Sequence, residues 1–418
     1  MYNKKTKRIY FDYAATTPVD KTVIDAMLPY FSQKFGNAMS IHFFGKEAEE
    51  AVDKARETLA DFLHCKSDEI IFTSGATESN NLAIKGVVKS YWANPPAGGW
   101  KPHIITTAFE HHCVLETCQS LEKDGLAEVT YIKPDREGII NPLDIKKAIR
   151  KNTILVSIMY VNNEIGTLQP IEEIGKILKS YPVKSDDHGA SKLKAKILFH
   201  TDATQAVNYF DCDVEKLDVD LLSLSGHKIY GPKGAGALYI KKGTPIRRIT
   251  DGGDQEFSLR AGTQNVPGIV GLGKAIELVA QNAKRETKKI EKLRNYLIKK
   301  VLQEIPNSKL NGSLKFRTPA NANFTFKDVE GESLLIALDM EGIACSTGSA
   351  CSTGSLEPSH VLLALGMKAE EAHGSLRITL GKDTAKQEID IFITKLKNII
   401  KHLRKISGKV LEEYYGLK

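Results

Sequence analysis

The sequence lacks the features that would place it in a membrane, secreted or repeat class of protein. No uninterrupted apolar run approaches the roughly 20 residues that a membrane-spanning helix needs. The start of the chain, Met1 to Arg8, is basic and has no apolar core of the kind found in signal peptides. There is no internal repeat and no low-complexity tract. These absences predict a cytoplasmic protein with no membrane segment.

The chain has six cysteines, and no two of them form a Cys-x-x-Cys pair. Their spacing suits neither a zinc site nor a disulfide framework, so we expect no bound metal. A scattered cysteine in a reducing compartment is most often a small buried apolar residue. That is the expectation for Cys65, Cys113, Cys118 and Cys212.

Cys351 differs from the other cysteines because small and polar residues surround it. The segment from Ser346 to Ser355 holds only Ser, Thr, Gly and Ala around this thiol, and such residues cannot build a core. An exposed, mobile loop is therefore predicted, on which a thiol can act as a nucleophile. Cys345 is the rival nucleophile by proximity. It follows Glu341–Ala344, which has the pattern of a strand entering the loop, so we prefer Cys351.

Length and charge set further bounds. A chain of 418 residues is too long for one ordinary core, so two domains are expected. The net charge of +7 permits weak attraction to acidic proteins or RNA without establishing it. Lysines are interleaved with acids, as in Lys284–Lys289, which favours a solvated helix face over a nucleic-acid surface. We therefore expect no direct nucleic-acid partner.

Apolar strand-like runs alternate with helical patterns from Glu69 to about Ile240. The run from Thr153 to Val161 is nearly continuous, which is typical of a strand covered on both faces. The alternation predicts an α/β fold with a mostly parallel sheet. A long helical pattern from Gly268 to about Ile305 then leads to a smaller α+β region that closes with an amphipathic helix.

Lys228 is the first candidate for chemistry. It follows a predicted strand, Val219–Ser225, and precedes a Gly/Pro-rich turn, at the kind of strand end where α/β enzymes hold their active sites. A lysine there can form a Schiff base with an aldehyde. Lysine frequency alone favours the alternative, a surface lysine in a turn. Ser225 and His227, which can donate to a phosphate, favour pyridoxal phosphate instead.

A pyridoxal phosphate site makes further demands, and the sequence meets each of them. Asp202 ends a strand-like run and can pair with the ring nitrogen, although it can also cap a helix. Thr77 follows a strand and a glycine and begins a helical pattern, an order that suits phosphate, although it too can be only a capping residue. His111 follows another strand-like run and can cover the ring, although a loop histidine is more often only structural.

These residues resemble a known family, the cysteine desulfurases of the fold-type I pyridoxal phosphate enzymes, and the match runs through nearly the whole chain. The Arg-x-Gly-Thr motif and the Ser/Gly/Ala/Cys loop resemble the subgroup that serves iron–sulfur cluster assembly and tRNA thiolation. The blocks that carry the resemblance are Phe11–Pro18, Thr73–Asn80, Val161–Gly166, Asp202–Gln205, Ser225–Gly234, Arg260–Thr263 and Ser346–Cys351.

The resemblance implies a role for each candidate residue. The catalytic residues would be Lys228, Cys351 and His111, and Arg377 with Asn163 would bind the substrate carboxylate. Thr263 would reach the cofactor of a second subunit, so a homodimer is implied. The cofactor, pyridoxal 5'-phosphate, would be held by Ala76, Thr77, His111, Asn163, Asp202, Gln205, Ser225, His227, Lys228 and Thr263.

The resemblance also implies a fold and an activity. The fold would be that of a fold-type I transferase, with a large domain around a seven-stranded, mostly parallel sheet at 18–265. A smaller α+β domain would comprise 1–17 and 266–418 and would carry the cysteine loop at about 345–356. The enzyme would convert L-cysteine to L-alanine, leave a persulfide on Cys351, and pass the sulfur to an iron–sulfur scaffold or tRNA-thiolation protein.

Two alternatives stay open. A selenocysteine lyase, an aminotransferase or another fold-type I enzyme would share Lys228 and Asp202 but would not need Cys351 on a mobile loop. A docking platform within a sulfur-transfer assembly would need no catalytic residue, so the intact Lys228, Asp202, His111 and Cys351 argue against it.

Overall fold

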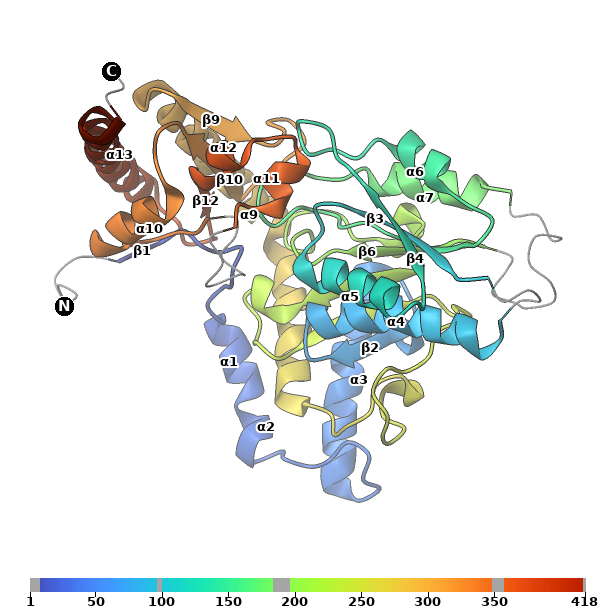
Figure 1. Ribbon diagram of the computed structural model, residues 1–418. Helices are drawn as coiled ribbons and strands as arrows, with labels where there is room; N and C mark the ends of the chain where they lie inside the picture. Colours follow the sequence, from blue (N-terminus) through green and yellow to red (C-terminus); the bar gives the residue numbers. More distant parts are fainter. Residues whose placement is uncertain (1–7, 96–99, 183–195, 348–356, 416–418) are drawn as a thin grey trace.

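The longest helix, α9 (Val266–Glu304), runs between two sheets in the computed structural model, which describes residues 8–95, 100–182, 196–347 and 357–415 (Figure 1). Its first half places Leu272 and Ile276 in the core of the larger sheet. Its second half places Leu297 and Val301 in the core of the smaller sheet. The helical pattern predicted from Gly268 to about Ile305 is confirmed, and one helix serves both cores.

The larger sheet has seven strands in the described residues, in the order β2-β8-β7-β6-β5-β3-β4. Neighbouring strands run parallel except at β8, which is antiparallel to both β7 and β2. The mostly parallel sheet predicted from the apolar runs is therefore confirmed. The strands are β2 (Ile70–Thr73), β3 (His103–Thr107), β4 (Glu128–Ile132), β5 (Thr153–Ser157), β6 (Leu198–Asp202), β7 (Leu221–Ser225) and β8 (Gly236–Ile240).

Helices cover both faces of this sheet, because successive strand residues point to opposite sides. Leu221 lies in the cluster formed with α4 and α5, whereas Leu222 lies in the cluster on the other face. Helices α4 (Ala76–Ala93) and α5 (His112–Lys123) pack side by side on one face (Figure 1). The opposite cluster takes apolar residues from α3 (Phe43–Leu63), α6 (Pro142–Ala148), α7 (Ile171–Ser180), α8 (Val214–Leu217) and the first half of α9.

The smaller sheet is antiparallel and has the order β12-β10-β9. The N-terminal strand β1 pairs in parallel with β11, so Ile9 and Tyr10 lie beside the chain that leads toward β12. The division of the chain into domains at 265 stays a prediction. The elements are β1 (Ile9–Tyr10), β9 (Ser308–Asn311), β10 (Asn321–Phe326), β11 (Ile343–Ala344), β12 (Ser375–Thr379), α10 (Gly331–Met340), α11 (His360–Ala364), α12 (Ala369–His373) and α13 (Lys386–Tyr415).

Three strands bring their carboxyl ends to the same edge of the larger sheet: β6 at Asp202, β7 at Ser225 and β2 at Thr73. After β2 the chain turns sharply at Gly75, whose φ of 146° is hard for other residues to adopt. A side chain at Gly236, on the neighbouring strand, would lie only 2.6 Å from the Gly75 Cα atom. The two glycines therefore let the start of α4 approach the end of β7.

Two short helices, α1 (Lys21–Met27) and α2 (Pro29–Ser32), precede α3 and pack against α9. In the parts of the chain that the structure describes, no helix combines the length and the apolar character needed to cross a membrane.

Candidate active site

A pocket of about 530 Å³ lies at this edge of the sheet. It brings together residues from segments more than 300 positions apart, from Ala14 to Arg377. Ten of the predicted site residues line it, namely Ala76, Thr77, His111, Asn163, Asp202, Gln205, Ser225, His227, Lys228 and Arg377.

Lys228 ends a short 3-10 turn, η4 (Gly226–Lys228), directly after β7. Its Nζ donates to the carbonyl oxygens of Ala14 (2.5 Å) and Ala15 (2.8 Å). The amine thus lines the pocket and is oriented by the N-terminal segment, unlike an ordinary surface lysine in a turn. Gln205, on the same side, donates from Nε2 to the Ala14 carbonyl (3.0 Å).

Asp202 lies at the end of β6 and is nearly buried. Its Oδ2 accepts from the Asn80 side-chain amide (2.7 Å), and its Oδ1 accepts from the Thr204 N–H (2.9 Å). The second contact resembles the cap that the sequence offered as an alternative, but a turn follows instead of a helix. A carboxylate held by two donors and kept from water suits a cationic ring nitrogen. Asn80 received no role in the sequence analysis, although it lies in the Thr73–Asn80 block.

The first turn of α4 faces the pocket with Ala76 and Thr77, and Ser225 lies opposite. Helix N-termini bind phosphate well because their N–H groups have no partner within the helix. His227 completes this end of the pocket, and its Nδ1 lies 3.2 Å from the Thr16 hydroxyl. Burial lowers the pKa of His227 to about 4, with further lowering by Lys228 and Lys233. A neutral imidazole there can donate one N–H to an anion.

His111 caps α5 and lines the pocket. Its Nδ1 accepts from the Cys113 N–H (3.2 Å), and the Cys113 Sγ lies 3.0 Å from the same nitrogen. Burial lowers the pKa of His111, although Asp202 opposes this. The Cys113 thiol faces the pocket, but burial raises its pKa to about 12, so it is a poor thiolate.

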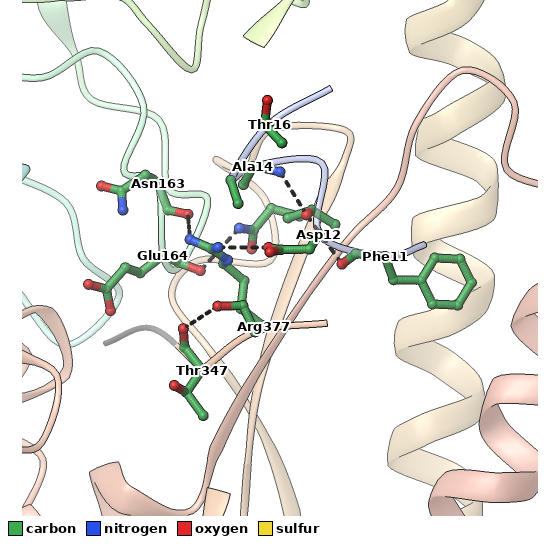
Figure 2. A network of polar contacts seen from close by, with 12 residues as sticks. Phe11, Asp12, Ala14, Thr16, Asn163, Glu164, Thr347 and Arg377 are labelled. Atoms are coloured by element: carbon green, nitrogen blue, oxygen red, sulfur yellow. Dashed lines mark hydrogen bonds and ion pairs between the residues drawn. The ribbon is translucent and has the colours of Figure 1, made fainter. Parts of the chain in front are cut away.

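Arg377 lies on β12 of the smaller sheet and lines the pocket. Figure 2 shows its guanidinium between Asp12 and Asn163. Its Nη2 donates to Asp12 Oδ1 (2.8 Å), and its Nη1 donates to the Asn163 carbonyl (3.1 Å). The guanidinium is thereby fixed in direction, with its side chain 4% exposed. A fixed planar guanidinium is suited to a carboxylate ligand. Asp12 lies in the Phe11–Pro18 block, but sequence reasoning gave it no role.

Three buried polar atoms of the pocket-lining residues have no hydrogen-bond partner among the described residues. They are Asn163 Oδ1, Thr204 Oγ1 and Arg377 Nε. Buried polar groups are nearly always satisfied, so their grouping in one pocket indicates a polar ligand. A ligand with a phosphate and a ring nitrogen fits the donors at α4 and the carboxylate of Asp202, and a carboxylate-bearing substrate fits Arg377.

Two predicted residues remain. Thr263 is exposed and is not among the described residues that line the pocket of its own chain. Cys351 lies outside the described residues. The chain on either side of it is anchored near the pocket: the Ser346 backbone pairs with that of Arg377, and the Ser359 hydroxyl donates to Glu164 Oε2 (2.5 Å).

The chain is similar over most of its length to known proteins. Residues 9–392 match the aminotransferase class-V family. The cysteine desulfurase IscS of Dictyoglomus turgidum is 52% identical over 401 residues, which cover 96% of each chain. A solved structure titled NifS-like protein has a TM-score of 0.84 and 37% identity, covering 95% of this chain and all of the other. Another, titled SspA in complex with cysteine, has a TM-score of 0.75 and 38% identity, covering 91% of this chain and all of the other.

The chain belongs to the aminotransferase class-V family, and within it to the cysteine desulfurases. Its fold is the fold-type I architecture of that family, as predicted.

Proposed function

We propose that this protein is a pyridoxal phosphate-dependent cysteine desulfurase that converts L-cysteine to L-alanine and leaves the sulfur on Cys351 as a persulfide. One observation carries the proposal: a single pocket holds an amine (Lys228), a buried carboxylate (Asp202) and a fixed guanidinium (Arg377). These are the groups needed for an aldehyde, a ring nitrogen and an amino-acid carboxylate, respectively.

The cofactor, when bound, supplies an electron sink for the bonds around the substrate Cα. Asp202 would keep the ring nitrogen protonated, and Asn80 holds the Asp202 carboxylate in place. Thr77, Ser225 and His227, with Ala76, would hold the phosphate. His111, Gln205 and Asn163 line the same pocket and would contact the ring.

Lys228 moves the proton at the substrate Cα. Its position at the Ala14 and Ala15 carbonyls keeps the amine at the wall of the pocket that Arg377 also lines. Arg377 binds the substrate carboxylate, and Asp12 and the Asn163 carbonyl prevent the guanidinium from turning away. His111, with its lowered pKa, can accept a proton from a thiol at neutral pH.

Cys351 takes the sulfur. Its thiolate attacks the substrate sulfur, the carbon–sulfur bond breaks with its electron pair left on carbon, and protonation at that carbon gives alanine. The sulfur atom ends as a persulfide on the enzyme, so no external oxidant is needed. Burial raises the pKa of Cys345 to about 12, which supports the choice of Cys351 over its neighbour.

A homodimer is part of the proposal. Large apolar side chains are exposed along one segment before and at the start of α3, with Ile41 93% exposed, and a second copy would remove them from water. Thr263 would then reach the partner's cofactor, which agrees with its exposure in a single chain. The segment comprises Leu28, Phe31, Phe35, Met39, Ile41, Phe43 and Phe44.

We propose a cytoplasmic setting in which the persulfide sulfur passes to an iron–sulfur scaffold or a tRNA-thiolation protein. A selenocysteine lyase is the alternative activity, and it would not need Cys351. The comparison with a structure titled as a complex with cysteine supports L-cysteine as the substrate.

The test is alanine and sulfide release from L-cysteine with a reductant, measured for the wild type and Cys351→Ala while the absorbance of the bound cofactor is recorded. We expect the variant to keep its cofactor absorbance and to lose turnover. Cys345→Ala is the matched control and should keep turnover. Turnover by Cys351→Ala at the wild-type rate would overturn the assignment in favour of a lyase or transferase.

A further inference from the structure

The segment that leads to Thr263 has an unusual backbone. Glu256, Phe257 and Ser258 have φ values of 47°, 55° and 63°, and none of them is glycine. Left-handed conformations at such residues are unfavourable, by roughly 1 kcal/mol or more each, and persist only where the surroundings impose them. The structure must therefore hold this turn in place.

A buried ion pair holds it. Arg56 on α3 donates from Nη1 and Nη2 to the two carboxylate oxygens of Glu256, each at 2.8 Å. The two side chains are 7% and 1% exposed. The Glu256 carboxylate also accepts from the Phe72 N–H (2.8 Å) and the Gln264 side-chain amide (2.6 Å). Four donors from three segments thus saturate one carboxylate.

The guanidinium of Arg56 is fixed as firmly. Its Nη1 also donates to the Ile70 carbonyl (2.5 Å), and its central carbon lies 4.7 Å from the centre of the Phe72 ring and 5.1 Å from that of Phe257. Buried pairs add little net stability, because desolvation offsets the attraction. The ion pair between Arg56 and Glu256 therefore matters for its geometry, because it holds the backbone at Glu256 in one conformation.

The 255–264 segment is linked to the pocket through Arg260 and Glu78. Gln255 accepts from the Gly262 N–H (3.0 Å), so the side chains of Gln255 and Glu256 fasten the residues on either side of Thr263. Arg260, which precedes Thr263 in the same segment, donates from Nε to Glu78 Oε1 (2.9 Å). Glu78 in turn accepts from the Ser74 N–H (2.6 Å).

Ser74 and Glu78 both line the pocket beside Thr77. Burial would raise the pKa of Glu78, but the hydrogen bonds from Arg260 and Ser74 outweigh it and lower the pKa. The carboxylate is therefore ionised, and the ion pair with Arg260 is the physical link between the 255–264 segment and the phosphate loop.

We propose that Glu256, held by Arg56, is a positioning residue for cofactor binding. It fixes the 255–264 segment so that Arg260 orients Glu78 and the Ser74–Thr77 loop in its own chain, and so that Thr263 is presented at one position to a second copy. The inference rests on the proposed function, because the bound group is the cofactor phosphate.

The test compares the same substitution at two buried arginines. Arg56→Lys removes the two-pronged contact to Glu256, and Arg294→Lys is the control, since Arg294 is equally buried but donates to the Thr318 carbonyl beside the smaller sheet. Apoprotein is titrated with pyridoxal 5'-phosphate and followed by absorbance. We expect the dissociation constant to rise about tenfold or more for Arg56→Lys and Glu256→Gln, and to stay unchanged for Arg294→Lys.

A second experiment tests whether Glu256 acts through Arg260 and Thr263, by combining Glu256→Gln with Arg260→Gln and Thr263→Ala. If Glu256 acts through the segment, Glu256→Gln should lower cofactor affinity only slightly further than those two changes already do. The inference would be overturned if Glu256→Gln lowered cofactor affinity in the double variant as much as it does in the wild type. It would also be overturned if Glu256→Gln alone bound the cofactor as tightly as the wild type.

Amide hydrogen exchange of the apoproteins gives a second measurement. Exchange of the amides in 255–264 should be faster in Arg56→Lys and unchanged in Arg294→Lys. Equal protection of these amides in the wild type, Arg56→Lys and Arg294→Lys would contradict the inference. Failure of the wild-type apoprotein to bind the cofactor would instead overturn the proposed function, and this inference with it, whatever the exchange data show.

Discussion

The two walls of the pocket are built in different ways. The sheet wall carries Asp202, Ser225 and Lys228, each at or within three residues of the end of a parallel strand. The Arg377 wall carries Asn163 from a loop after β5 and Arg377 from the smaller sheet, and Asp12 of the N-terminal segment supports Arg377. Neighbouring strands thus determine the first wall, whereas contacts between distant segments determine the second.

The walls also differ in the hydrogen bonding of their charged groups. On the sheet wall, both Asp202 oxygens have donors, and the atom without a partner among the described residues is the Thr204 hydroxyl. On the Arg377 wall, Asn163 Oδ1 and Arg377 Nε itself have no partner among the described residues. The Asp202 carboxylate is therefore preorganised for a permanently bound group, and the Arg377 guanidinium is open to a ligand that comes and goes.

The largest expected effect comes from the sheet wall. Lys228→Ala should lower kcat for alanine formation by at least about 10³-fold, because Lys228, which follows the end of β7 beside Asp202 on β6, is the amine proposed to move the substrate proton. Alanine release and the absorbance of the bound cofactor are the measurements. Lys233→Ala, a change at a second pocket lysine that lies on the turn after Lys228, is the control and should keep most of the activity. Comparable losses in both variants would refute the assignment.

The next effect comes from the Arg377 wall. Arg377→Lys should raise the KM for L-cysteine by about 10- to 100-fold, because a lysine cannot make the two-pronged contact with a carboxylate. Cofactor affinity should change less than KM, since Arg377 contacts the main-chain carbonyl of Asn163 and the Asp12 carboxylate and so bears on the cofactor only indirectly. Steady-state kinetics measure the KM, and a cofactor titration measures the cofactor affinity. A loss of cofactor affinity without a change in KM would show that the walls are not independent.

A smaller effect is expected from the residues that orient each wall. Asp12→Asn should raise KM about 3- to 10-fold, because it weakens one charge-assisted hydrogen bond to Arg377. Asn80→Ala should instead lower cofactor affinity by a similar factor, since Asp202 loses its amide donor. The paired measurement is KM against cofactor affinity for both variants. If both variants changed the same parameter, the comparison of the two walls would fail.

The smallest change in turnover is expected from Glu164→Gln. The stability of this variant relative to the wild type should nevertheless depend on pH. Burial raises the pKa of Glu164 to about 7, and Ser359 and Arg377 only partly oppose this. Between pH about 4.5 and 7 the unfolded chain loses this proton and the folded chain keeps it, so stability falls as pH rises. The variant should therefore gain about 3 kcal/mol relative to the wild type over that range.

Denaturant unfolding at pH 4.5, 6 and 7.5 measures this gain. Glu57→Gln, at an exposed position on α3, is the control and should show no such trend. A constant difference between Glu164→Gln and the wild type at all three pH values would contradict the prediction.

Sequence reasoning named candidate residues that the structure brings to one pocket, and it missed the residues that hold them in place. Lys228 and Asp202 could be found because a strand pattern ends at each of them, and the family resemblance added Arg377. Asn80 and Asp12 lie inside blocks that carried the resemblance, yet nothing local shows that their partners are 122 and 365 residues away. The ion pair between Arg56 and Glu256 was missed for the same reason, since its partners are 200 residues apart.

By itself the sequence determined the parallel sheet, the long helix α9 and the strand ends that carry Lys228 and Asp202, because apolar periodicity and turn residues act over a few positions. Only the tertiary structure decided the direction of Arg377, the donors around Asp202 and the left-handed turn at Glu256. Those features depend on which distant segments meet, and buried polar groups and unfavourable backbone conformations persist only where such partners are brought together.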